Sequence, residues 1–154
     1  MTLSQRKKAI NMLKIAYTIL ATVPGVPCIY YGDEAGMEGY RDPFNRLPYP
    51  WGKENAELLD YYKRIGRIRI NEPLYKDGYF DIVECTSELL AFARYNDNQF
   101  AITVVNRSDK KIHIDSNVTL KNIETNREIT TVLPNKVYIL KGNCSYENLS
   151  IEFL

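Results

Sequence analysis

The sequence predicts an α+β chain in which a helical N-terminal half precedes an all-β C-terminal half. Apolar residues recur at helical spacing over residues 3–22 and again over residues 54–70. From Leu74 onward their period changes to two, which is typical of strands that bury one face. This change of period predicts two domains, one over residues 1–73 and one over residues 74–154.

The first predicted helix covers residues 3–22, and Ser4 is its expected N-cap. A stripe at helical spacing contains Ile10, Leu13, Ala16 and Leu20, and it is widened by Met12, Ile15 and Ile19. Toward Leu20 the helix is apolar nearly all round, which predicts burial on more than one side. The Pro24-Gly25 pair should end it.

Residues 27–31, PCIYY, form a short and continuous apolar run. Its length, its β-branched residue and its aromatics favour a strand, and the unbroken apolarity favours a parallel strand that is covered on both faces. A helix, a tight turn and a buried strand in this order are typical of an α/β barrel or an open α/β sheet. The second predicted helix, over residues 54–70, should end at Asn71-Glu72-Pro73.

Between the predicted strand and the second helix lies a long loop, residues 32–51, in which charged groups alternate with aromatics. Its charged residues are Asp33, Glu34, Glu38, Arg41, Asp42 and Arg46, and its aromatics are Tyr40, Phe44, Tyr49 and Trp51. Loops of this length are usually functional or disordered, and the aromatic content argues against disorder. Carboxylate, guanidinium and aromatic groups together suit a ligand that is rich in hydroxyls.

Asp42 and Arg46 are the candidate binding residues, because a spacing of four allows both side chains to enter one cleft. The alternative interpretation is that they only pair with each other and fix the loop. Asp33 and Glu34 are adjacent, so on an extended segment their side chains point to opposite sides and make a poor catalytic pair. Their expected role is to hold the loop through backbone N–H groups.

The C-terminal half contains seven candidate strands separated by turn signals such as Asn96-Asp97-Asn98 and Pro134-Asn135. The candidate strands are residues 79–84, 89–95, 99–106, 111–114, 128–132, 136–140 and 151–154. Short strands at this spacing predict a small antiparallel sandwich.

Composition excludes several classes of protein. Twenty Lys and Arg balance nineteen Asp and Glu, which argues against a nucleic-acid partner. No apolar run is long enough for a membrane span, and we expect no membrane partner.

Three scattered cysteines and a single histidine, His113, imply no disulfide framework, metal site or cofactor. Sparse cysteines and an N-terminus without an apolar core favour a cytoplasmic protein. Of the twelve tyrosines, most are expected to fill cores.

The segment PGVPCIYYGDEAGMEG, followed by DPFNR and YPW, resembles the last strand of the catalytic barrel in the α-amylase family, glycoside hydrolase family 13. It is similar in particular to neopullulanase, cyclomaltodextrinase and maltogenic amylase. The matching residues are Pro24, Gly25, Pro27, Ile29, Tyr30, Tyr31, Gly32, Asp33, Glu34, Gly36, Asp42, Pro43, Arg46, Pro50 and Trp51.

The resemblance implies the last α-β-α portion of a (β/α)₈ barrel, with the seventh helix at 3–22, the eighth strand at 27–31 and the eighth helix at 54–70. Residues 74–154 would be the Greek-key C-terminal domain of the family. The family's three catalytic carboxylates follow its fourth, fifth and seventh strands, so no catalytic residue carries over and the chain alone is expected to be inactive. Asp42 and Arg46 map onto residues that contact the sugar. Relatives often have a second Arg where this chain has Leu47, which puts its fine specificity in doubt.

The resemblance therefore predicts the C-terminal fragment of a retaining α-glucan hydrolase. The intact enzyme would act on α-1,4 bonds of maltooligosaccharides, with α-1,6 bonds as an open alternative. Two other readings remain open, a carbohydrate-binding or structural module without hydrolysis, and an interaction protein. The last follows from physics, because an incomplete barrel leaves strand edges and an apolar face unpaired, which favours self-association.

Overall fold

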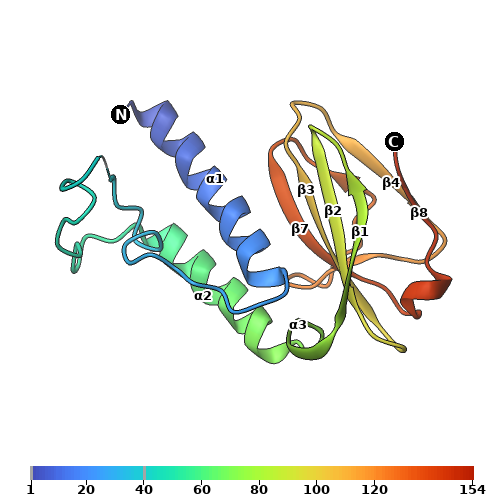
Figure 1. Ribbon diagram of the computed structural model, residues 1–154. Helices are drawn as coiled ribbons and strands as arrows, with labels where there is room; N and C mark the ends of the chain where they lie inside the picture. Colours follow the sequence, from blue (N-terminus) through green and yellow to red (C-terminus); the bar gives the residue numbers. More distant parts are fainter. Residues whose placement is uncertain (1, 40) are drawn as a thin grey trace. The chain divides into compact units, whose positions relative to one another are not determined.

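The computed structural model describes residues 2–39 and 41–154, which divide into two compact units (Figure 1). The first unit contains residues up to Ala21 together with Gly25–Arg69, and the second contains Thr22–Pro24 together with Ile70–Leu154. Together they form an α+β chain whose sheets are antiparallel, as the sequence predicts. The predicted domain boundary after Pro73 stays a prediction.

The first unit is built on two long helices, α1 (Leu3–Thr22) and α2 (Ala56–Asn71), joined by a long irregular segment (Figure 1). Both predicted helices are confirmed, although the predicted cap is wrong. Thr2 caps α1 instead of Ser4, because its Oγ1 accepts from Gln5 N at 3.2 Å and Gln5 Oε1 accepts from Thr2 N at 2.9 Å. This reciprocal pair is a capping box. Asn55 Oδ1 accepts from Leu58 N and starts α2.

The buried face of α1 differs from the predicted stripe. Its buried residues are Ile15, Tyr17, Thr18, Ala21 and Thr22, whereas Met12, Ala16 and Leu20 of the predicted stripe are exposed. The side that packs on α2 is more polar than expected, since Thr18 Oγ1 lies 2.6 Å from Tyr61 Oη. Because the helix is apolar nearly all round, its period could not distinguish this side from the opposite one.

The predicted strand over residues 27–31 is not formed, since this segment has no regular structure. Ile29, Tyr30 and Tyr31 are exposed rather than covered on both faces. A parallel strand exists only when a neighbouring strand completes its hydrogen bonds. The first unit contains no other strand among its described residues, so the apolar run has no partner to pair with.

The second unit begins with the short helix α3 (Leu74–Asp77), which the sequence reasoning missed. The strands that follow are β1 (Tyr79–Cys85), β2 (Leu89–Tyr95), β3 (Phe100–Asn106), β4 (Ile112–Ser116), β5 (Lys121–Asn122), β6 (Thr131–Val132), β7 (Lys136–Lys141) and β8 (Ile151–Phe153), with a 3₁₀ turn, η1 (Tyr146–Asn148), before β8. All seven predicted strands are found, β6 in shortened form, and β5 was not predicted.

The strands form two antiparallel sheets, one in the order β1-β2-β3-β7-β5 and one in the order β6-β4-β8. Figure 1 labels β1, β2, β3 and β7 of the first sheet and β4 and β8 of the second. Their shared core is apolar and draws on both sheets, with Leu89, Ala91, Ala93, Phe100, Ile102, Val104, Ile114, Leu120, Val132 and Leu140. Strand β3 is buried along its whole length and lies at the centre of the larger sheet. Burial does not alternate along β3, because neighbouring elements cover both of its faces.

Candidate functional site

The long loop between α1 and α2 begins with a tight turn over residues 32–37. The Gly32 N–H donates to Glu34 Oε2. The Gly32 carbonyl oxygen accepts from Ala35 N at 3.1 Å and from Met37 N at 3.0 Å. Gly32 has a φ of +93°, which L side chains rarely adopt, and a Cβ there would meet the Met37 side chain. The positive φ therefore favours glycine at this position, because any other residue would be strained there.

The carboxylate of Glu34 fixes this turn, since its Oε2 accepts from Gly32 N at 3.0 Å. The predicted role of Glu34 in holding the loop through a backbone N–H is thus confirmed. Asp33 makes no such contact among the described residues, but burial and then the charge of Glu34 raise the pKa of its carboxyl group. The backbone of the turn is tied to the start of α2 by Asn55 N, which donates to Ala35 O at 2.9 Å.

A pair of buried tyrosines joins the two helices of this unit. The rings of Tyr17 and Tyr62 are stacked, with centroids 3.8 Å apart and planes 2° from parallel. Burial raises the pKa of both hydroxyls, and the charge of Asp33 adds to the shift at Tyr62. Tyr17 was not among the residues predicted for the apolar stripe of α1. Its spacing of four from Leu13 and from Ala21 is a signal that could have found it.

The two candidate binding residues are brought together. Arg46 Nε lies 2.7 Å from Asp42 Oδ1, and the Asp42 and Arg46 side chains are 61% and 70% exposed. A turn positions them, because Phe44 N donates to Arg41 O at 2.8 Å and Arg46 N donates to Pro43 O at 3.0 Å. The pairing that the sequence allowed as an alternative is present. An exposed pair contributes only about 0–1 kcal/mol to stability, and the remaining guanidinium donors face no partner among the described residues.

The aromatic residues of the loop divide into structural and exposed ones. Tyr31 Oη donates to Leu47 O at 2.9 Å and thereby joins the two ends of the loop. Tyr49 and Trp51 have ring centroids 4.6 Å apart, and Trp51 is 81% exposed. Phe44 is also exposed. Tyr40, which the sequence analysis placed among these aromatics, lies outside the described residues.

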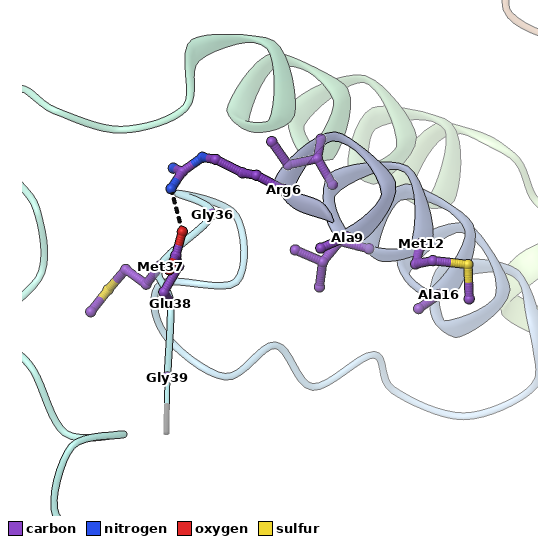
Figure 2. Close-up of a pocket in the computed structure, with 10 residues that line it drawn as sticks. Arg6, Ala9, Met12, Ala16, Gly36, Met37, Glu38 and Gly39 are labelled. Carbon is purple, nitrogen blue, oxygen red and sulfur yellow. Dashed lines mark hydrogen bonds and ion pairs between the residues drawn. The ribbon is translucent and has the colours of Figure 1, made fainter. Parts of the chain in front are cut away.

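A mostly apolar groove of about 490 Å³ lies between α1 and residues 36–39 (Figure 2). Its walls include Ala9, Ile10, Met12, Leu13, Ala16 and Met37. One end is closed by an ion pair in which Arg6 Nη1 lies 2.6 Å from Glu38 Oε1, shown as the dashed line in Figure 2. The predicted apolar stripe of α1 thus lines this groove instead of a closed core.

Other kinds of site would rest on metal ligands, on the single histidine or on the helices. Over residues 2–39 and 41–154, no three His, Cys, Asp or Glu side chains gather so as to hold a metal ion. His113 Nδ1 lies 3.2 Å from Thr131 Oγ1, across the pairing of β4 and β6. Among the described helices, none combines the length and apolarity that a membrane span requires.

No model of a protein family matches the chain. Several curated proteins are similar to it over most of its length, and two of them illustrate the likeness. An amylopullulanase of Thermoanaerobacter thermohydrosulfuricus is 34% identical over 86% of the chain, and a cyclomaltodextrinase of Thermoanaerobacter pseudethanolicus is 32% identical over 84% of it. The chain spans only 10% of the first protein and 24% of the second.

A solved structure agrees with these relatives. The maltogenic amylase of S. marinus superimposes with a TM-score of 0.74 at 33% identity, covering 88% of this chain and 20% of that one. The similarity extends through both the helical residues and the β residues, because it covers nearly the whole chain. The chain belongs to the α-amylase family, glycoside hydrolase family 13, and corresponds to the C-terminal part of its amylopullulanase-, cyclomaltodextrinase- and maltogenic amylase-like members.

Proposed function

We propose that this chain is the C-terminal portion of an α-glucan hydrolase, in which it supplies substrate contacts and structural support rather than the reacting groups. The observation that carries the proposal is the exposed pair of Asp42 and Arg46 at the tip of a loop that is otherwise fixed by hydrogen bonds. The names of the relatives, amylopullulanase and cyclomaltodextrinase, support an α-glucan as the substrate class.

In this proposal residues 1–73 complete a (β/α)₈ barrel. Helix α1 is the seventh barrel helix, residues 27–31 are the eighth strand and α2 is the eighth helix, and residues 74–154 are the Greek-key domain. Residues 27–31 would become a strand in the intact enzyme, because neighbouring barrel strands would supply the missing hydrogen-bond partners. The exposed apolar side chains of Ile29, Tyr30 and Tyr31 support this reading.

Asp42 and Arg46 would contact hydroxyls of the glucan, Asp42 as an acceptor and Arg46 as a donor. Their ion pair orients both groups before the sugar arrives, which lowers the cost of ordering them. The chemistry of retaining hydrolysis would come from carboxylates elsewhere in the intact enzyme, since Asp33 is partly buried and Glu34 is bonded to Gly32 N.

Replacing Arg46 by methionine, or Asp42 by asparagine, should weaken the binding of maltoheptaose about tenfold, because a charge-assisted hydrogen bond contributes about 1.5–3 kcal/mol. Isothermal titration calorimetry on the purified chain measures this. The matched control is the other exposed pair at the same spacing, Asp60 and Arg64 on α2, where Asp60→Asn should leave the affinity unchanged. Equal affinities for the chain, Arg46→Met and Asp42→Asn would remove the proposed sugar contacts.

A second candidate function, self-association, is favoured by the apolar groove on α1. We expect the isolated chain to form dimers or larger species, because exposed apolar surface of this kind is usually covered by a partner. Light scattering over a range of concentrations measures the mass, and Met12→Lys should shift the distribution to monomer. Val26→Lys, at an exposed apolar residue outside the groove, is the control. A chain that is monomeric at every concentration would contradict this expectation.

A further inference from the structure

Three tyrosines that the sequence did not indicate as a site gather on the surface of the β unit. Tyr79 begins β1 and pairs across the strands with Tyr95 at the end of β2, and Tyr146 lies in η1. The rings of Tyr79 and Tyr95 are 5.6 Å apart, and those of Tyr95 and Tyr146 are stacked at 4.3 Å. The three rings therefore form one continuous aromatic surface, the tyrosine cluster.

Two adjoining hollows flank the tyrosine cluster, with volumes of about 360 and 600 Å³. Both are lined by Tyr95 and Glu147, so they meet at these residues. The smaller hollow is also lined by Tyr79, Asn96, Asp97 and Ser145. Sites of this size suit a small ligand or a segment of a larger one.

The polar groups around the cluster are held in place by the fold. Asn96 Oδ1 accepts from Asn98 N and from Gln99 N, both at 3.0 Å, which fixes the hairpin turn and leaves the amide Nδ2 as a donor. Tyr146 Oη donates to Asp81 Oδ2 at 2.9 Å. Burial and this hydrogen bond raise the pKa of Tyr146, so its ring stays neutral. The site is thus built before any ligand binds.

Charge narrows the class of ligand. Asp81, Asp97 and Glu147 line the two hollows, and no Lys or Arg is among the described residues that do so. An anionic ligand such as a phosphate would be repelled. A neutral ligand rich in hydroxyls fits, because carboxylates accept from hydroxyls and an aromatic face covers apolar C–H groups.

A purely structural role accounts for only part of the cluster. Cross-strand aromatic pairs stabilise sheets, and this explains why Tyr95 lies between its two neighbours. It does not explain why Tyr79 remains 66% exposed at the edge of the sheet beside a polar hollow. An exposed ring in this position offers a face that the fold itself does not use.

We propose that the tyrosine cluster is a second saccharide-binding site, in which the ring of Tyr79 covers one sugar unit while Asp97, Glu147 and Asn96 bind its hydroxyls. That the saccharide is an α-1,4-linked glucan rests on the proposed function of the chain. By holding one part of a glucan chain, the site would raise the local concentration of the other glucose units of that chain around this protein.

The test is a titration of the chain with maltoheptaose, observed through the NMR signals of the tyrosine rings. The Tyr79 signals should shift, and Tyr79→Ala should weaken this binding about tenfold, as expected for the loss of one aromatic contact. Tyr79→Phe keeps the ring and should retain the affinity within about twofold. The control is Phe80→Ala, which removes an exposed ring on the opposite face of the same strand.

The same titration on the double variant Asp42→Asn, Arg46→Met separates this site from the loop. Tyr79 shifts that persist there support an independent site, and shifts that vanish overturn it. A third arm compares cellohexaose, a β-linked glucan, with maltoheptaose. If cellohexaose binds more tightly at Tyr79, the saccharide site is supported, but the α-glucan substrate of the proposed function is contradicted. If Tyr79→Ala binds maltoheptaose as well as the unchanged chain, or if only an oligolysine peptide shifts Tyr79, the proposal is wrong.

Discussion

Replacing Arg94 by methionine is expected to lower the free energy of unfolding of the β unit by about 3 kcal/mol or more. Arg94 is only 2% exposed, and its guanidinium donates to three backbone carbonyls. Nη2 reaches Gly78 O at 2.9 Å, Nε reaches Tyr79 O at 3.2 Å, and Nη1 reaches Thr22 O at 3.4 Å. Methionine fills similar space but donates nothing, so each carbonyl would lose its partner at a cost of about 1–3 kcal/mol.

Urea unfolding followed by circular dichroism measures this loss. Arg107→Met is the matched control, because Arg107 is exposed and its change should stay within about 0.5 kcal/mol. A loss below about 1 kcal/mol at Arg94 would mean that water replaces the guanidinium at these carbonyls. Arg94 would then have no special part in joining the start of β1 to Thr22.

The second large effect concerns catalysis. Hydrolysis of maltoheptaose by this chain should proceed at the uncatalysed rate, at least about 10⁶-fold below that of a full-length relative. Retaining hydrolysis requires two carboxyl groups about 5–5.5 Å apart on either side of the bond. In the loop, Glu34 accepts a hydrogen bond from Gly32 N, and Asp42 forms an ion pair with Arg46. We therefore expect these carboxylates not to act as the catalytic pair.

The sequence predicted the β unit well, because the apolar runs that form its strands are separated by clear turn residues and are buried in the structure. Strand β2 (Leu89–Tyr95) was found with its correct bounds, since its apolar residues are bordered by turns at both ends. The short strand β5 and the turns α3 and η1 were missed, because elements of two to four residues carry no measurable period.

The prediction of a strand at residues 27–31 was wrong although its local signals were strong. Its residues carry every local sign of a buried strand, yet a strand is completed by its neighbours, and these are not part of the first unit as described. The same argument applies to α1. Its length was predictable from the sequence, but which apolar side would be buried depends on what packs against it.

The candidate site was predictable in part. Spacing placed Asp42 and Arg46 together, whereas the exclusion of Asp33 and Glu34 as a catalytic pair stays a prediction. The stacking of Tyr17 on Tyr62 and the tyrosine cluster were not predictable, because both bring together residues that are far apart in the sequence. Counting tyrosines indicated an unusual content but not where the rings would meet.

We infer that this chain binds an α-glucan without cleaving it. The most direct test incubates the purified chain with maltoheptaose and records, in one NMR time course, the protein signals of Arg46 and Tyr79 and the anomeric protons of the sugar. The expected result is that the protein signals shift at once while no new reducing ends appear over days. Shorter maltooligosaccharides forming in proportion to the amount of chain would contradict the claim.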